Sequence, residues 1–351
     1  MKMVDGENMS RSTKSSMFVK IFIPIICIML IQTGIINVFL FASGTTDALN
    51  YNSIDILSKN VQNRGSHLEH LMVHYWSNVD RLEFEVIEGI RAYLEEYGLT
   101  IADVLGNREL EIAVLDNMSG KLIDALRGTS ATGVFMYFLS GEGLIEEVQH
   151  LNGLYYRDLS LLTNIHANLM FVRGHVDIAR KDSIPLDSLW NEFFTFDPQH
   201  QEMWRSFAYP QIAAAQLPNA SSVDLSFWNR PHFLNADSVV DANEQITYTR
   251  PIIIGGQVIA MIGTEMQLSH MERHFPARDL DNFSEGGYML VRYCMYQAAE
   301  SCSYGDIFRV TGAFMNRLLS GVQGVTLRET HRDGVHIIAE LPEVHVVYYS
   351  M

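Results

Sequence analysis

A single, predominantly apolar segment, residues 17–42, constrains this chain more than any other feature of the sequence. The segment is about 26 residues long, and Lys20 is its one charged member. Because roughly 20 apolar residues suffice to cross a bilayer as a helix, we predict a transmembrane helix here. The basic residues before and within it are Lys2, Arg11, Lys14 and Lys20. By the positive-inside rule, the N-terminus is expected in the cytoplasm and residues 44–351 outside it.

A cleaved signal peptide is the alternative explanation of this segment. Its apolar region normally spans roughly 7–15 residues and is followed by a cleavage site with small residues. The run over 17–42 is longer, and Phe41-Ala42-Ser43-Gly44 is a poor cleavage sequence. We therefore favour an anchor. It gives a cytoplasmic stub over 1–16, a single pass through the plasma membrane over 17–42, and an extracytoplasmic remainder.

Composition narrows the classes of partner. The net charge is −16 and the basic residues form no cluster, which argues against nucleic acid and anionic lipid as partners. About 308 residues remain beyond the apolar segment, enough for two domains, and a hydrophobic content of 48% is ample for packed cores. Cys27 lies in the apolar segment, while Cys294 and Cys302 lie outside it. A disulfide between these two and a pair of free thiols are both compatible with the sequence.

The segment 44–97 is expected to form one long helix that leaves the membrane as a stalk. Apolar residues repeat in it at alternating spacings of four and three: Leu68, Met72, Tyr75, Val79, Leu82 and Val86. This heptad-like seam is suited to holding tandem domains or to forming a homodimer. The stalk is expected to end at Gly98-Leu99-Thr100.

Two sheet regions are expected after the stalk. The first contains an aromatic, β-branched run at 131–139 and the clearest hairpin of the chain, formed by 245–254 and 257–266 around a Gly-Gly turn. Shorter strand-like runs follow between positions 287 and 349. We therefore predict an α+β fold with one domain over 98–270 and a second, smaller domain over 271–351.

Sequence motifs for catalysis are absent. There is no Gly-rich phosphate loop, no G-x-S-x-G elbow and no H-E-x-x-H motif. Histidines recur at helical spacing in two groups, which are His67, His70 and His74, and His270 and His274. Either group is able to bind a metal, but both are expected on polar helix faces with no carboxylate base to complete a hydrolytic site. We therefore predict no metal, no cofactor and no enzymatic activity, and keep an anchored metal-dependent envelope hydrolase as an alternative.

Aromatic and charged residues are concentrated between positions 153 and 265, and such a mixture is typical of a small-molecule pocket. The candidate ligand-binding residues are Tyr156, Arg157, Asp158, Trp204, Arg205, Tyr209, Asp224, Trp228, Tyr248 and Glu265. Arg205 and Glu265 would give the pocket one cation and one anion, which favours a polar or zwitterionic ligand. The alternative is that the aromatics are core residues whose polar tips reach surface partners.

Several strings in this region resemble one known family. They are GLYYRDLS at 153–160, NLMFVRG at 168–174, DLSFWNRP at 224–231, ITYTRPI at 246–252 and VIAMIGTEM at 258–266. With the anchor and the long helix, they resemble the extracytoplasmic double-Cache (dCache) sensor domains of Firmicute membrane-bound diguanylate cyclases and sensor histidine kinases. The resemblance covers residues 44–351.

The resemblance implies two tandem PAS-like antiparallel sheets beside the long helix, with the ligand in the membrane-distal domain. Amino-acid-binding members carry an R-x-W-Y motif and an acidic residue on the last distal strand. Here Arg205-Ser206-Phe207-Ala208 matches only the arginine, and Glu265 stands where the acidic residue is expected.

The implied function is that of a ligand-sensing domain of a signal-transduction receptor. The output domain, a diguanylate cyclase or a histidine kinase, is expected to be missing from this chain. A truncated receptor and a stand-alone anchored binding protein are both compatible with the sequence. A non-binding dimerisation module remains a further alternative.

Overall fold

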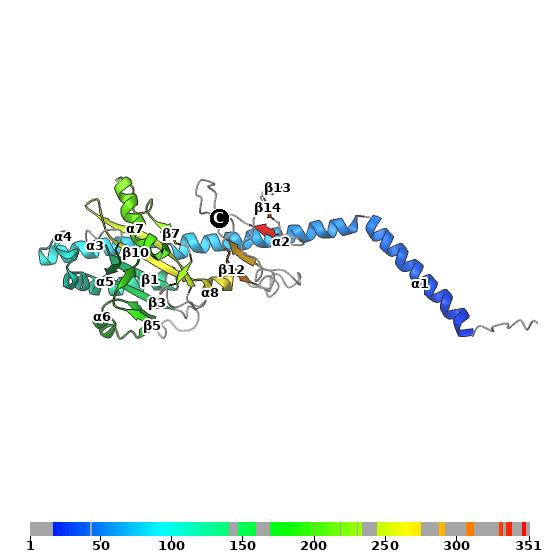
Figure 1. Cartoon of the computed structure of the whole chain (residues 1–351), viewed down its shortest axis with the longest axis horizontal. Helices are drawn as coiled ribbons and strands as arrows, with labels where there is room; N and C mark the ends of the chain where they lie inside the picture. The colour runs from blue at the N-terminus through cyan, green and yellow to red at the C-terminus, as the bar shows by residue number, and fades with distance from the viewer. Residues whose placement is uncertain are drawn as a thin grey trace, which may run out of the picture. The chain divides into compact units, whose positions relative to one another are not determined.

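The computed structural model describes residues 17–42, 44–139, 147–158, 169–199, 201–217, 219–229, 231–233, 244–274, 288–291, 307–311, 330–332, 335–338 and 346–348. The chain divides into two compact units, residues 1–60 and 61–351. Each is described by itself, with the elements labelled as in Figure 1. The predicted cytoplasmic stub, Cys294 and Cys302 lie outside the described residues.

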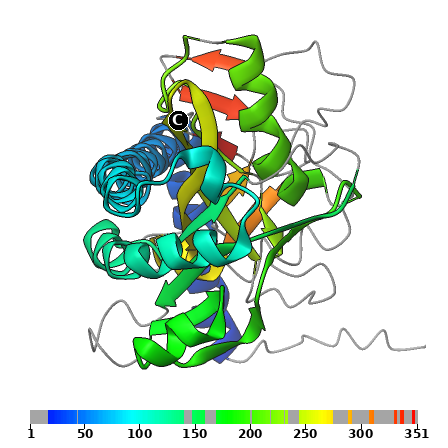
Figure 2. The same cartoon turned by 90° about the vertical axis from the view of Figure 1, so that its left-hand side faces the viewer.

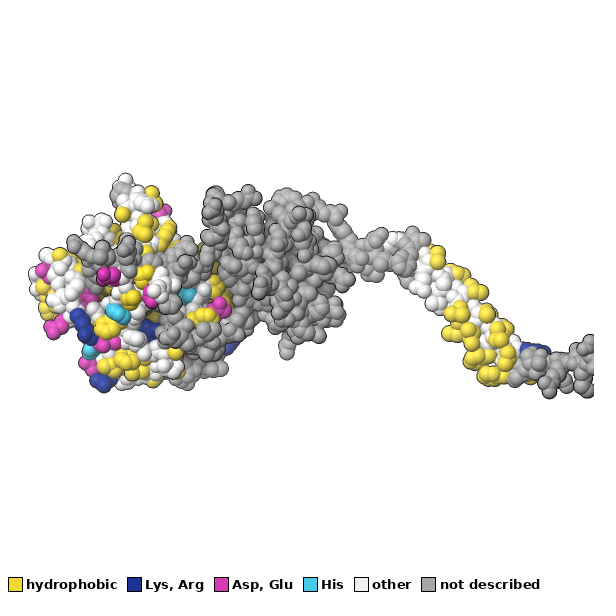
Figure 3. All heavy atoms as spheres, viewed as in Figure 1, with side chains coloured by type: hydrophobic (Ala, Val, Ile, Leu, Met, Phe, Trp, Pro, Cys, Tyr) yellow, Lys and Arg dark blue, Asp and Glu magenta, His cyan; other side chains and the backbone are white. Residues whose placement is uncertain are grey.

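The N-terminal unit contains helix α1 (Met17–Ala42) and the first part of helix α2 (Thr45–Leu71). Residues 17–39 are all exposed, and Figure 3 shows hydrophobic side chains along α1. The segment Met17–Phe39 is long and apolar enough to cross a membrane. A signal sequence near an N-terminus meets the same criteria, so the anchor and its topology stay predictions.

The segment predicted as one helix over 44–97 consists of three helical pieces. Helix α2 ends at Leu71, the π-helical turn η1 covers Met72–Trp76, and helix α3 (Asp80–Tyr97) begins after a break. A tertiary contact lies at the break, because the Trp76 carbonyl accepts a hydrogen bond from the hydroxyl of Thr264 in the sheet. Helix α3 ends where predicted, at Gly98, which has the left-handed conformation (φ 65°) that favours glycine.

Four of the six residues of the heptad-like seam face the protein's own core, while Tyr75 is exposed. Leu68, Val79, Leu82 and Val86 are at most 2% exposed, and the last three belong to the main hydrophobic cluster. Intramolecular packing therefore accounts for this part of the periodicity. The homodimer stays a prediction.

The centre of the second unit is an eight-stranded sheet. Its strands are β1 (Gly133–Phe138), β3 (Gly153–Asp158), β4 (Leu169–Arg173), β5 (Leu186–Asn191), β7 (Phe227–Trp228), β8 (His232–Phe233), β9 (Glu244–Ile254) and β10 (Gln257–Gln267). Their order is β5-β4-β3-β1-β10-β9-β7, with β8 also paired to β9. All pairs are antiparallel except β4 with β5. The predicted hairpin is present as β9 and β10, and Gly255 and Gly256 in its turn have φ angles of 62° and 81°.

Hydrophobic layers cover both faces of this sheet. On one face, helices α3 and α5 bury alternate residues of β1 such as Val134 and Phe138. On the other face, Phe135 and Tyr137 pack against a two-stranded ribbon and helix α7. These covering elements are α5 (Arg108–Thr129), α7 (Gln201–Gln216), β2 (Gln149–Leu151) and β6 (Phe194–Phe196). Figure 2 shows α3 and α5 on one side of the sheet and α7 on the other.

Shorter elements complete the described fold. The helices are α4 (Ile101–Val104), α6 (Val176–Lys181), α8 (Leu268–Met271) and the 3₁₀ turn η3 (Glu272–His274). Strand β11 (Tyr288–Val291) pairs with β12 (Ile307–Thr311), and a separate small sheet contains β13 (Thr330–Arg332), β14 (Val335–Ile338) and β15 (Val346–Tyr348). The fold is thus mixed α and β. A second Cache-like domain over 271–351 stays a prediction.

Candidate ligand site

A polar row crosses the sheet on the face opposite α3 and α5. The β1 residue Gly133 pairs with Arg157 of β3 on one side and with Glu265 of β10 on the other. Paired residues point to the same face, so the missing side chain of Gly133 lets the long side chain of Arg157 reach Glu265 across β1. A Cβ atom at position 133 would lie 2.9 Å from the ring of Tyr155 and 3.2 Å from the Cβ of Glu265.

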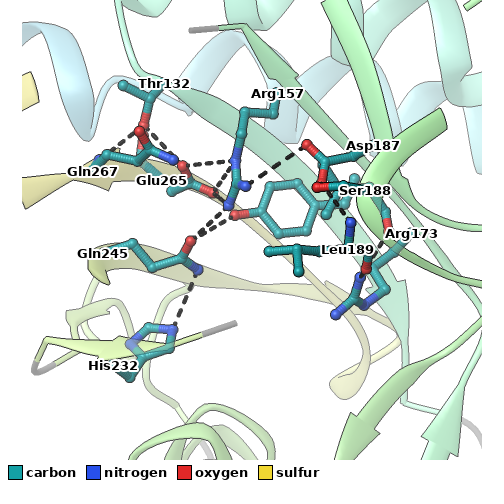
Figure 4. Close-up of polar contacts among 12 residues, drawn as sticks. Thr132, Arg157, Arg173, Asp187, Ser188, Leu189, His232, Gln245, Glu265 and Gln267 are labelled. Carbon is teal, nitrogen blue, oxygen red and sulfur yellow. Dashed lines mark hydrogen bonds and ion pairs between the residues drawn. The ribbon is translucent and has the colours of Figure 1, made fainter. Parts of the chain in front are cut away.

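Arg157 and Glu265 form a buried ion pair (Figure 4). The Arg157 Nη2 lies 2.7 Å from Oε2 of Glu265, and its Nε lies 3.1 and 3.2 Å from the two carboxylate oxygens. Their side chains are 2% and 0% exposed. This paired, charge-assisted geometry is the strongest kind of contact between these two groups.

Neighbouring polar groups extend the pair into a network (Figure 4). Arg157 Nη2 also donates to Oε1 of Gln245 at 2.8 Å, and Nη1 lies 4.0 Å from Oδ2 of Asp187. The Thr132 hydroxyl is 3.0 Å from Oε1 of Glu265 and accepts a hydrogen bond from the Gln267 amide at 2.9 Å. Groups from β3, β5, β9 and β10 therefore meet at one place.

Burial shifts the acid–base properties of the pair in opposite senses. Burial raises the pKa of the Glu265 carboxyl, and the hydrogen bond from Thr132 lowers it. The guanidinium of Arg157 also acts against the effect of burial, because an opposite charge at hydrogen-bond distance favours the carboxylate. Burial lowers the pKa of Arg157 to about 10, although nearby Asp187 raises it. Arg157 therefore stays cationic at neutral pH.

An aromatic cluster lies beside the network on the same face. Phe194 contacts the rings of Phe135, Tyr137 and Tyr155, with centroids 6.4, 5.0 and 6.0 Å away. The Arg157 guanidinium lies 5.6 Å from the centroid of the Tyr155 ring. The site thus combines fixed charges with a hydrophobic wall, a composition found in pockets for small polar molecules.

Comparison with known proteins adds one weak similarity. No family model matches this chain, and no curated protein matches it. A solved structure similar to it is described as "Crystal Structure of the extracellular domain of the putative histidine kinase soHK1S-Z6". The two share 15% sequence identity and a TM-score of 0.36, and the alignment covers 70% of each chain. Similarity at this level establishes neither a shared fold nor a shared function.

The structure brings two of the candidate ligand-binding residues together, Arg157 and Glu265. Three others lie on the opposite face of the sheet, in the layer covered by helices. The Tyr156 hydroxyl is 2.7 Å from Oγ of Ser119 in α5, and the rings of Trp228 and Tyr248 contact each other at 5.3 Å. Tyr156 and Tyr248 belong to the main core there, and Trp228 packs against it.

The side chains of the remaining candidates either lie apart from the network or are outside the described part of the structure. Asp224 is exposed and accepts hydrogen bonds from the amide and hydroxyl of Ser221, which lower its pKa. Tyr209 of α7 is 36% exposed. Asp158 ends β3, and its amide donates to the Thr132 carbonyl. Trp204 and Arg205 belong to α7, but their side chains are outside the described part of the structure.

Sequence reasoning missed four side chains of the network: Thr132, Asp187, His232 and Gln245. Gln245 has a signal in the sequence, because Gln245, Thr247 and Thr249 alternate with apolar residues along β9 and so share one face of the sheet. His232 has none, since its Nε2 lies 3.5 Å from the side-chain amide nitrogen of Gln245 only because β8 pairs with β9.

The two histidine groups lie next to each other. The rings of His67 and His274 are 5.7 Å apart, those of His270 and His274 are 5.8 Å apart, and those of His70 and His74 are 4.6 Å apart. Burial, Arg273 and His274 lower the pKa of His270 to about 4. Among the described residues, no group of three or more histidine, cysteine or acidic side chains has a geometry that could hold a metal ion.

Proposed function

We propose that the chain is the membrane-anchored, extracytoplasmic ligand-sensing part of a signal-transduction receptor. Its ligand site is the network of Arg157, Glu265 and Gln245 on the sheet face opposite α3 and α5. The observation that carries the proposal is the burial of this ion pair, whose side chains are 2% and 0% exposed.

A buried ion pair needs a reason other than stability. Desolvating two charges costs several kcal/mol per ion, and replacing such a pair with apolar residues of similar volume is often neutral or stabilising. A ligand that engages these groups supplies the reason. Charges that are already out of water interact strongly with a charged ligand group placed beside them.

The groups present favour a small polar ligand that carries both charges. Arg157 offers guanidinium donors suited to a carboxylate or a similar anion. Glu265 and Asp187 offer acceptors suited to an ammonium group. The aromatic cluster beside them would exclude water from the bound molecule.

Sensing would follow from the fact that Arg157 and Glu265 are paired with each other in the absence of a ligand. Because Arg157 and Glu265 are enclosed and paired, a ligand can reach them only in a conformation in which they separate. Binding then shifts the population towards that conformation. The apolar helix α1 would anchor the domain, and an output domain of the diguanylate cyclase or histidine kinase kind would respond.

A thermal-shift screen of small polar metabolites against the detergent-solubilised full chain tests the binding proposal. A ligand of the site should raise the unfolding temperature of the wild type but not of Arg157→Lys, because lysine lacks the paired donors of the guanidinium. Arg91→Lys is the control, since Arg91 forms an exposed pair with Glu88 on α3. An equal shift in Arg157→Lys would refute the site, and a library without any hit would favour the non-binding module.

The topology has its own test. Alkaline phosphatase fused after Met351 should be active, because this enzyme folds only outside the reducing cytoplasm. A reporter that is active only in the cytoplasm, fused at the same position, should be silent. The reverse result would refute an extracytoplasmic domain.

A further inference from the structure

A π-helical turn interrupts the helices at the point where they meet the sheet. The turn η1 (Met72–Trp76) follows α2 directly, and the chain leaves the helix at Ser77, whose amide donates to the Met72 carbonyl at 3.0 Å. π-Helical turns are rare and occur often at functional sites. This turn is part of the one covalent path from the apolar segment to helix α3 and the sheet.

The segment between α2 and α3, residues 72–79, is here called the junction. Two residues of the β9–β10 hairpin hold it in place through polar contacts. The Thr264 hydroxyl of β10 donates to the carbonyl of Trp76. Arg250 of β9, whose side chain is 6% exposed, contacts both Asp80 and Glu83 in the first turn of α3. The Thr264 contact lies just before the break in the helix, and the two Arg250 contacts lie just after it.

Apolar packing adds to these contacts. The side chain of Trp76 is 1% exposed and packs in a small cluster separate from the main core. The other buried members of this cluster are Leu68, Ile246, Met266, Leu268 and Met271. They come from α2, both strands of the hairpin and α8, so the junction is packed against the hairpin itself.

Strand β10, which contacts the junction through Thr264, carries part of the ligand site on its other face. Thr264 and Glu265 are consecutive residues of β10, so their side chains point to opposite faces. Thr264 contacts the helical junction while Glu265 contacts Arg157. The backbone of Glu265 is also fixed, because its carbonyl accepts a hydrogen bond from the Thr132 amide at 2.9 Å. A change in the pairing of Glu265 therefore acts on a peptide that directly adjoins the junction contact.

We propose that η1 is a latch, meaning that its contact with β10 keeps the junction packed against the hairpin and depends on the state of the ion pair. The contact of Thr264 with Trp76 holds the junction against the hairpin while Glu265 is paired with Arg157. Separation of this pair weakens the contact. The proposal rests on the proposed function for its physiological trigger. The coupling between Glu265 and the junction, however, exists with or without a ligand.

Hydrogen–deuterium exchange of the detergent-solubilised full chain tests the latch without any ligand. The measured quantity is the exchange rate of amides in residues 72–79 divided by that of helix α5. In Thr264→Val, which removes the hydroxyl, this ratio should rise about fivefold, as for the loss of one hydrogen bond. In Glu265→Gln, which keeps the shape but removes the charge, it should rise about twofold or more. Glu88→Gln, on the exposed face of α3, should leave it unchanged.

The outcomes separate the latch from the ligand proposal. An unchanged ratio in Glu265→Gln would overturn the latch, and so would equal loosening of η1 and α5. If this variant does not fold, the double variant Arg157→Met/Glu265→Leu takes its place with the same criterion. A raised exchange ratio in Glu265→Gln together with a metabolite screen that finds no ligand would support the latch. It would refute only the proposal that the network binds a ligand.

Discussion

Breaking the buried pair on one side should cost far more than removing both partners. In Arg157→Met, Glu265 would lose a guanidinium that contacts both its oxygens, at 2.7 to 3.2 Å, in a site with 0% exposure of the carboxylate. The carboxylate would be left buried without its counter-charge. We expect the free energy of unfolding to fall by about 3–5 kcal/mol.

The double variant Arg157→Met/Glu265→Leu should recover this loss. Both charges are then absent, and methionine and leucine fill the space beside the aromatic cluster. Its free energy of unfolding should equal that of the wild type or exceed it by up to about 1–4 kcal/mol. The two single variants and the double variant together form a thermodynamic cycle that isolates the pair.

Urea unfolding of the full chain in detergent, followed by circular dichroism, measures these differences. The matched control is the exposed pair of Arg91 and Glu88 on α3, with side chains 59% and 52% exposed. There the same substitutions should change stability by no more than about 1 kcal/mol. If Arg157→Met costs no more than the control, the pair is not a desolvated contact and the reasoning is wrong.

Further predictions concern four other residues of the domain. Gly133→Ala should lower stability by about 1–3 kcal/mol, because its methyl group meets the Tyr155 ring. Gly120→Ala, where a Cβ atom meets nothing within 4 Å inside α5, should raise it by roughly 0.5–1 kcal/mol, and urea unfolding compares the two. Tyr156→Phe should cost about 1 kcal/mol in the same assay through loss of its contact with Ser119. His270, with its pKa lowered to about 4, binds a proton more readily when unfolded. The contribution of His270 to the free energy of unfolding should therefore be fully present above about pH 6.5 and be lost as the pH drops towards about 4. A His270→Gln variant whose free energy of unfolding falls with pH as steeply as that of the wild type would contradict this.

Local patterns were sufficient where the structure is local. The Gly255-Gly256 turn between two β-rich runs predicted the β9–β10 hairpin, and Gly98 predicted the end of α3. The break after Trp76 was missed because its partner, Thr264, is 188 residues away. No spacing within 44–97 carries that information.

The candidate site shows the same division. Arg157 and Glu265 were both recognised as suitable residue types, but the sequence paired Glu265 with Arg205 in one pocket. Strand alternation alone would have separated Tyr156 from Arg157, since neighbours on a strand face opposite sides. The pairing of Arg157 with Glu265 depends on the β3-β1-β10 order, which the sequence did not supply.

Ligand binding by the double variant Arg157→Met/Glu265→Leu tests the central claim most directly. This variant is expected to be at least as stable as the wild type, so a loss of binding cannot be attributed to unfolding. Isothermal titration with a metabolite that shifts the unfolding temperature of the wild type should give no measurable heat of binding. Binding to the double variant with unchanged affinity would contradict the account, because the ligand would then lie elsewhere on the protein.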